Sequence, residues 1–208
     1  QNPEDWWQAT VHSIKEVISR VNPQCIVAIG FSGQMHSLVP LDESGNPVRN
    51  SIIWCDKRSQ TQVDEINERC GADRISNICH SPVGTGFLLS SLLWMKENES
   101  IKFKSISHVL LAKDYIRYRL TNKFCTEITD AAGTLAFDVE KENWSDELLS
   151  LLDIPSSIFP ERIGTPTEIS GYVTREAAAI TGLKEGLPCV FGGADQVMQA
   201  VLNGIVKS

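Results

Sequence analysis

The sequence predicts an α/β fold, because helix patterns and strand patterns alternate from one end of the chain to the other. A helix pattern near the start is followed by a continuous apolar run over residues 25–29. Near the end, an apolar run over residues 188–191 leads through two glycines into another helix pattern. No repeat, low-complexity tract or linker interrupts the 208 residues, so we expect a single domain.

The first predicted helix is capped by Asn2, and Pro3 takes its first position. Its apolar residues recur at spacings of four and three and form one stripe: Trp7, Val11, Ile14, Ile18 and Val21. Asn22-Pro23 ends the helix. The run 25–29 that follows has no polar residue, which is typical of a strand buried on both faces.

The middle of the chain predicts a hairpin and then mostly helices. Residues 38–41 and 48–54 flank the turn-forming segment 42–47, so we expect them to pair. Apolar periodicity predicts helices over about 59–69, 86–97 and 113–121, and a short strand over 108–111.

The last third predicts two capped helices and a closing strand–turn–helix unit. One helix follows Trp144-Ser145, and the other runs over 174–181 and is closed by Gly182. The final unit consists of the strand 188–191, the turn 192–194 and a helix over about 195–205.

Composition excludes several classes of protein. The net charge is −7 and basic residues are dispersed, so we expect no nucleic-acid partner. The longest apolar stretch, Phe87 to Met95, is too short to span a membrane, and the polar start resembles no signal peptide. The six cysteines form no C-x-x-C pair, which favours reduced thiols in the cytoplasm over disulfides or zinc. Because Gln1 stands where an initiator Met would, we expect an excised piece of a longer chain.

Three familiar catalytic motifs are incomplete in this sequence. Gly30-x-Ser32-x-Gln34 lacks the last glycine of a serine-hydrolase elbow. Gly84-x-Gly86 lacks both a preceding strand and the third glycine of a dinucleotide fingerprint. No G-x-x-x-x-G-K-[ST] sequence is present. Hydrolase, Rossmann oxidoreductase and P-loop functions therefore lose their main support.

Two polar segments follow predicted strands, where α/β proteins gather their ligands. The first is Gly33-Gln34-Met35-His36-Ser37, and the second is Gly192-Gly193-Ala194-Asp195-Gln196. Each also has a structural interpretation: Asp195 could be an ordinary helix cap, and His36 could simply be packed or solvated. Neither segment decides the function by itself.

Five segments, in the same order, resemble blocks of the FGGY family of carbohydrate kinases. They are Gly33–His36, Ile53–Arg58, Lys113–Ile116 with Arg119–Thr121, Thr129–Thr134 with Phe137-Asp138 and Trp144-Ser145, and Gly192–Asp195. The resemblance extends over nearly the whole chain. It implies the actin-like, ribonuclease-H-like α/β fold and the transfer of a phosphoryl group from ATP, with Mg²⁺, to a sugar hydroxyl. Residues 1–208 would be a partial N-terminal, sugar-binding lobe that lacks its first strands and the nucleotide-binding lobe, and would be inactive alone.

The resemblance also implies roles for single residues. Asp195 would be the catalytic base, Met35 and His36 would line the sugar site, and Gln34 and Gln196 would be neighbours of the substrate. For Trp54, Asp56 and Arg58, support of the pocket and direct contact with the sugar remain equally open. The ligands of ATP and Mg²⁺ would lie mainly outside this chain.

The sugar is less narrowly defined than the family. Gln34-Met35-His36 favours a xylulokinase-like reaction, from D-xylulose to D-xylulose 5-phosphate, because glycerol kinases carry Arg and Glu after the Gln. Residues 81–86 follow that pattern only loosely, so gluconokinase or another pentulose kinase stays open. A non-catalytic sugar-binding module is the alternative from another class. The expected partner is a small sugar, without nucleic acid or membrane, and a homodimer is possible.

Overall fold

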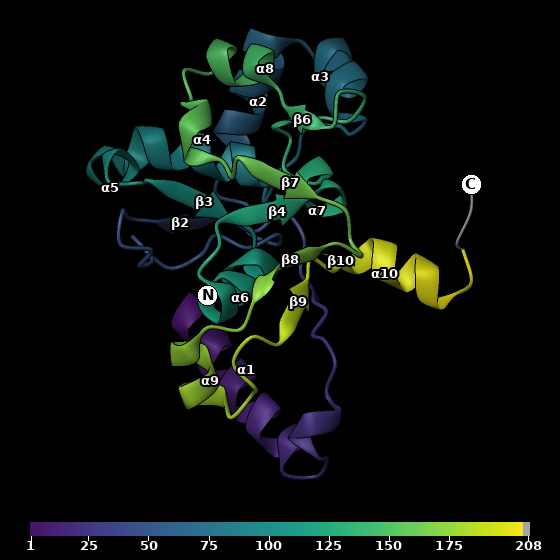
Figure 1. Ribbon diagram of the computed structural model, residues 1–208. Helices are drawn as coiled ribbons and strands as arrows, with labels where there is room; N and C mark the ends of the chain where they lie inside the picture. Colours follow the sequence, from purple (N-terminus) through teal and green to yellow (C-terminus); the bar gives the residue numbers. More distant parts are fainter. Residues whose placement is uncertain (206–208) are drawn as a thin grey trace.

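The computed structural model describes residues 1–205, and Figure 1 shows short strands between two groups of helices. Helices α2, α3, α4 and α8 lie on one side of the strands and α1, α6 and α9 on the other, while α10 extends away from the body. The helices, with η for 3₁₀ turns, are α1 (Pro3–Ile18), η1 (Pro23–Cys25), α2 (Gln60–Cys70), α3 (Ala72–Cys79), α4 (Leu88–Asn98), α5 (Ser100–Lys104), α6 (Ala112–Thr121), α7 (Ile128–Ala132), α8 (Asp146–Leu151), η2 (Ser156–Ile158), α9 (Arg175–Thr181) and α10 (Asp195–Leu202).

The strands are short and pair two by two. They are β1 (Ser32–Gly33), β2 (Val39–Leu41), β3 (His108–Leu110), β4 (Cys125–Glu127), β5 (Phe137–Asp138), β6 (Asn143–Trp144), β7 (Arg162–Gly164), β8 (Ile169–Tyr172), β9 (Pro188–Val190) and β10 (Gly193–Ala194). Strands β1 and β10 are parallel, as are β4 and β7, whereas β2–β3, β5–β6 and β8–β9 are antiparallel. The β1–β10 pair sets Ser32 opposite Gly193 and so joins the two polar segments that follow the predicted strands.

Two hydrophobic clusters hold the helices in place. The larger is built from residues between Leu38 and Phe159, mainly on α2, α3, α4 and α8. The smaller packs α1 against α6 and α9 around Trp7, Tyr115 and Leu120. In α1, Asn2 accepts a hydrogen bond from the Glu4 amide, which confirms the predicted cap.

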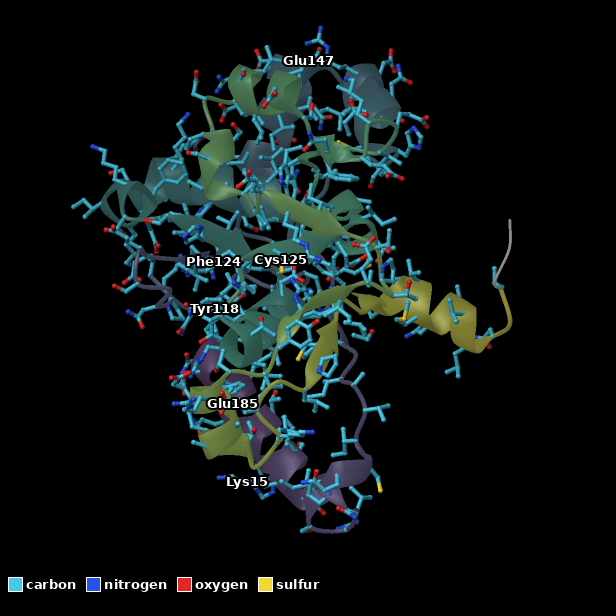
Figure 2. All side chains as sticks on the ribbon, in the orientation of Figure 1. Lys15, Tyr118, Phe124, Cys125, Glu147 and Glu185 are labelled. Atoms are coloured by element: carbon cyan, nitrogen blue, oxygen red, sulfur yellow. The ribbon has the colours of Figure 1, made fainter. Side chains whose placement is uncertain are left out.

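A short aromatic stack fixes the chain between α6 and β4. The Phe124 ring lies 3.8 Å from the His108 ring and 4.4 Å from the Tyr118 ring, both nearly parallel to it (Figure 2). Cys125, the first residue of β4, follows directly and is buried. The stack therefore sets where β4 begins relative to α6.

Most predicted helices are confirmed, including the N-caps at Ser145 and Thr174 and the left-handed C-cap at Gly182. The predicted hairpin forms only in part. Leu41 bridges Pro47 and Leu38 bridges Ile52, but the main partner of β2 is β3. Helix α3 and the short strands β4, β7 and β8 were not predicted; each of these strands carries few apolar residues.

The prediction of a buried strand over residues 25–29 is wrong. Residues 23–25 form a 3₁₀ turn, Ile29 makes a single bridge to Cys189, and Val27 is 81% exposed. Within the described residues this run belongs to no strand of a sheet; Ile26 and Ile29 pack partly buried against the smaller hydrophobic cluster, and the other side chains of the run are exposed. Separately, no helix of residues 1–205 combines the length and apolarity needed to cross a lipid bilayer.

The turn from β9 into β10 depends on Gly192. Its φ is +74°, and a Cβ atom there would lie 1.8 Å from the Phe31 carbonyl oxygen. Gly186 also has a positive φ, +78°, but a Cβ atom there would have nothing within 4 Å. A comparison of alanine substitutions at the two glycines therefore separates the stability cost of the positive φ from the stability cost of the clash with Phe31.

We predict that Gly186→Ala lowers the free energy of unfolding by about 1–2 kcal/mol, the cost of an L-residue at positive φ. Gly192→Ala should lower it by about 3–5 kcal/mol, because the backbone must also move away from the new methyl group. Urea unfolding of the two variants and the parent measures both values. Equal losses would show that Gly192 serves only to adopt its dihedral angle.

Candidate functional site

A cavity of about 210 Å³ is lined by Met35, His36, Trp54, Asp195 and Gln196. Four of these are residues that the sequence analysis assigned to the site. They come from the loop after β1, the loop before α2 and the first turn of α10. The parallel β1–β10 pair brings the first and last of these segments together.

His36 has an unusual backbone that its surroundings hold in place. Its φ is +66°, and the Ser37 amide donates to the Met35 carbonyl across it at 2.8 Å, which closes a tight three-residue turn. The ring lies 4.2 Å from the Phe87 ring, and its Nδ1 lies 2.6 Å from the Gly133 carbonyl oxygen. Because a carbonyl oxygen can only accept, Nδ1 carries the proton of this hydrogen bond.

This hydrogen bond leaves Nε2 as the ring nitrogen of His36 that is available to a ligand. No described residue makes a hydrogen bond to it. The close approach of the ring requires Gly133, because a Cβ atom there would lie 3.1 Å from Nδ1 and 2.8 Å from the Met35 methyl carbon. This close contact explains why the 129–134 block has a glycine at position 133.

Asp195 is the first residue of α10, and Ala194 is the N-cap. The Asp195 carboxylate accepts a hydrogen bond from the adjacent Gln196 amide at 2.8 Å and is half-buried at the cavity. The interpretation of Asp195 as an ordinary N-cap is therefore wrong, because the cap position belongs to its neighbour. The positive end of the α10 dipole lies at the same place and favours negative charge there.

The segment after the predicted hairpin contributes Trp54 alone to this cavity. Trp54 is 58% exposed, and an exposed indole at a cavity offers an apolar face to a ligand. Asp56 and Arg58 instead pair with each other through two hydrogen bonds of 2.9 and 2.8 Å. Arg58 also lies over the Trp94 ring, and neither Asp56 nor Arg58 lines this cavity.

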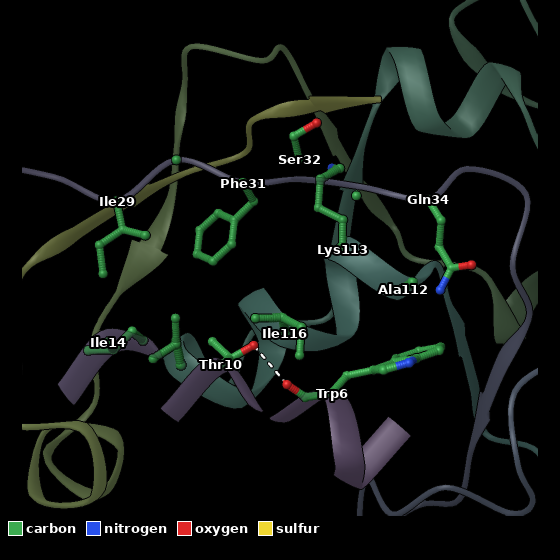
Figure 3. A pocket seen from close by; sticks show the side chains of 13 residues that line it. Trp6, Thr10, Ile14, Ile29, Phe31, Ser32, Gln34, Ala112, Lys113 and Ile116 are labelled. Atoms are coloured by element: carbon green, nitrogen blue, oxygen red, sulfur yellow. Dashed lines mark hydrogen bonds between the residues drawn. The ribbon is translucent and has the colours of Figure 1, made fainter. Parts of the chain in front are cut away.

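Gln34 lies apart from the other predicted site residues. Its amide donates to the Gln1 side chain at 3.2 Å. It lines a different cavity of about 320 Å³, together with Trp6, Phe31 and Lys113 (Figure 3). A third cavity, of about 480 Å³, shares Met35 and His36 with the first and is mostly apolar.

The sequence analysis missed a cluster of buried charges behind the site. Lys113 Nζ lies 3.2 Å from an Asp114 oxygen, 3.4 Å from Glu127 and 3.2 Å from Asp130. Arg117 pairs with Asp114 at 2.8 Å, and all five side chains are fully enclosed. The signal available in the sequence was the group of charged residues at positions 113, 114 and 117 of one predicted helix.

Asp130 is the least satisfied member of this cluster. Neither of its oxygens receives a well-directed hydrogen bond, although Lys113 is near enough for an ion pair. Burial raises the pKa of Asp130 to about 7, the carboxylates of Asp114 and Glu127 add to the rise, and Lys113 opposes it. With a proton on Asp130, the two cations of the cluster, Lys113 and Arg117, would be balanced by its two remaining carboxylates, Asp114 and Glu127.

Residues 1–202 match the family model described as the FGGY family of carbohydrate kinases, N-terminal domain. The chain is 39% identical to a xylulose kinase of Staphylococcus xylosus over 98% of its own length and 42% of the relative. A solved xylulose kinase from Rhodospirillum rubrum superposes with a TM-score of 0.93 at 28% identity, over 100% of this chain and 43% of that one. A gluconate kinase structure from Lactobacillus acidophilus superposes with a TM-score of 0.88 at 28% identity, over 95% of this chain and 40% of that one. The chain thus spans less than half the length of these relatives.

The raised pKa of Asp130 makes stability depend on pH. A carboxyl group with a folded pKa near 7 and an ordinary value of 3.8 takes up a proton on folding, so its contribution to stability falls as the pH rises from about 4 to about 7. We predict that Asp130→Asn, which mimics the protonated form, becomes more stable relative to the parent as the pH rises through this range. Urea unfolding at pH 5 and pH 8 measures the difference, and exposed Asp146→Asn is the control. A difference that stays the same at pH 5 and pH 8 would show that Asp130 is ionised throughout this range.

Proposed function

Because the chain belongs to the FGGY family of carbohydrate kinases, we propose that it forms the sugar-binding part of an ATP-dependent sugar kinase. The reaction we propose for the whole protein converts D-xylulose to D-xylulose 5-phosphate. The observation that carries the proposal is the cavity that joins His36 and Asp195, which are 159 positions apart, with Met35, Trp54 and Gln196. Relatives named xylulose kinase that cover the chain over 98% of its length support this choice of sugar.

Asp195 would act as the general base. A sugar hydroxyl is a weak nucleophile, and a carboxylate beside it can accept its proton as the bond to phosphorus forms. The start of α10 favours negative charge at this place, including the charge of an incoming phosphate. Phosphoryl transfer needs little more from the protein than such positioning and charge.

The other lining residues would hold the sugar. His36 would accept a hydrogen bond from a sugar hydroxyl at Nε2, because its Nδ1 proton is committed to Gly133. Met35 and Trp54 offer apolar surface to the C–H face of the sugar, and Gln196 offers an amide that can both donate and accept.

A neutral ketose suits the cavity better than a sugar acid. Gluconate carries a carboxylate, and the described lining includes no Lys or Arg to balance that charge in a cavity that already contains Asp195. The similarity to a gluconate kinase structure keeps that substrate as the alternative within the family.

ATP, which the family implies, would be the phosphoryl donor. Among residues 1–205, no group of three or more His, Cys, Asp or Glu side chains is placed to hold a metal ion. We propose that the ligands of the Mg²⁺ that accompanies ATP lie mainly outside residues 1–205. For location we propose the cytoplasm, in keeping with six free cysteine thiols in the described chain.

The substitution Asp195→Asn tests the general base. We predict that it lowers kcat of the whole protein about 10²- to 10⁴-fold, because the amide cannot accept the proton. Thermal stability and sugar binding should persist, since the substitution changes neither size nor the oxygen that meets the Gln196 amide. ATP-coupled phosphorylation of a panel of neutral and acidic sugars gives the rates and the preferred substrate.

Asp146→Asn is the matched control for this test, because Asp146 is also the first residue of its helix, α8, but is exposed. A kcat within about tenfold of the parent for Asp195→Asn would show that Asp195 is not the general base.

The substitution His36→Ala tests the substrate contact. Loss of one hydrogen bond to a buried hydroxyl is expected to weaken transition-state stabilisation by about 1–3 kcal/mol. This lowers kcat/KM for the sugar roughly 5- to 150-fold. The KM for ATP should change little, because His36 would touch the sugar. Exposed His12 on α1 provides the control His12→Ala. An unchanged sugar kcat/KM would show that His36 serves only the local packing.

A further inference from the structure

We infer that Thr129 is a positioning residue that sets the place of the Asp195 carboxylate, an inference that rests on the proposed role of Asp195 as base. The two residues are 66 positions apart, and Thr129 belongs to α7. The Thr129 hydroxyl meets the Ala194 amide, which immediately precedes Asp195, at 2.9 Å. Thr129 itself would not touch the reacting atoms.

The Ala194 N–H can only donate, and Glu127 fixes the orientation of the Thr129 hydroxyl that accepts from it. The Thr129 hydroxyl has one proton, and the Glu127 carboxylate oxygens lie 2.8 and 2.9 Å from it and can only accept. The proton therefore goes to Glu127, and a lone pair of the hydroxyl oxygen faces the Ala194 N–H. Glu127 is held in turn by the Thr129 and Asp130 amides at 2.7 and 2.9 Å and by Lys113.

The segment before Asp195 is anchored at further points by the same buried cluster. Lys113 Nζ and Arg117 Nη1 each lie 3.5 Å from the Phe191 carbonyl oxygen. On the other side, the Gly193 amide donates to the Phe31 carbonyl at 3.0 Å. The backbone is thus held at Phe191, Gly193 and Ala194, each contact coming from a different part of the chain.

Helix α10 supplies no such anchor after Asp195. None of its residues is buried, and it extends away from the body of the molecule (Figure 1). The position of Asp195 is therefore set by the residues that precede it. The Thr129 hydroxyl is the contact nearest to the carboxylate in sequence, only one residue away, and it is made by a side chain that can be changed alone.

The test compares Thr129→Val, which keeps the shape but removes the hydroxyl, with Thr129→Ser, which keeps the hydroxyl. In the whole kinase we expect Thr129→Val to lower kcat roughly 10- to 100-fold with little change in the KM for sugar, because misplacing a reacting group by about 1 Å has an effect of this size. Thr129→Ser should stay within about threefold of the parent.

Thr181→Val is the matched control. Thr181 is more buried than Thr129, and its hydroxyl likewise makes two hydrogen bonds: it donates to the Ala177 carbonyl at 2.7 Å and accepts from the Leu183 amide at 3.3 Å, but it lies at the end of α9. If the loss of kcat in Thr129→Val reflects only a lost buried hydrogen bond, Thr181→Val should lose as much kcat.

A double-mutant cycle with Asp195→Asn shows whether Thr129 acts through Asp195. We expect Thr129→Val to cause no further loss of kcat once Asp195 is Asn, whereas independent effects would multiply. A kcat for Thr129→Val within about twofold of the parent, or a full further loss in the Asp195→Asn background, would overturn the inference.

Hydrogen exchange at the Ala194 amide, measured by NMR in the whole protein, tests the contact without using activity. Thr129→Val should speed its exchange at least about tenfold, and Thr129→Ser should not. If Asp195→Asn keeps its activity, the proposed base fails, and this measurement still decides whether Thr129 holds Ala194. Unchanged exchange in Thr129→Val would refute the contact.

Discussion

Lys113 lies within a fully enclosed set of charges, and its ammonium group must be balanced inside the protein because no water reaches it. Burial alone would lower its pKa, but the surrounding carboxylates of Asp114, Asp130 and Glu127 outweigh that effect and raise it. These carboxylates come from α6, β4 and α7. Balancing the one ammonium group of Lys113 therefore requires α6, β4 and α7 to meet at one point. Contacts from this cluster also hold the segment that leads to Asp195.

A buried ion cluster is a weak source of stability, because desolvation cancels much of the attraction between the charges. Its value lies in geometry. A hydrophobic core of the same volume would accept several arrangements of its side chains, whereas the hydrogen bonds of Glu127 to the α7 amides and to Thr129 accept very few. A carboxylate that must meet one hydroxyl of a bound sugar needs that kind of support.

The predicted α/β, actin-like fold is confirmed, and so are most helices, because caps and apolar spacing are local signals that the sequence displays directly. The buried strand over residues 25–29 was wrong because burial depends on a neighbouring strand, which local pattern does not reveal. In the site, glycine turns marked two candidate segments, and the resemblance to the FGGY family assigned Met35, His36, Asp195 and Gln196 within them; the cavity gathers these four residues. The separate position of Gln34 and the buried charge cluster were not predicted, because side-chain direction and ion pairing are set by tertiary contacts.

The parallel pairing of Ser32 with Gly193 has a consequence for the order of folding. The larger hydrophobic cluster uses residues between Leu38 and Phe159 only, so everything it needs has been synthesised before β9 and β10 leave the ribosome. Closing a loop that contains most of the chain carries a large entropic cost and is slow. We therefore expect the cavity lined by His36 and Asp195 to be the last part of the described chain to assemble, and a nascent chain that stops short of residue 193 to be compact before it has that cavity.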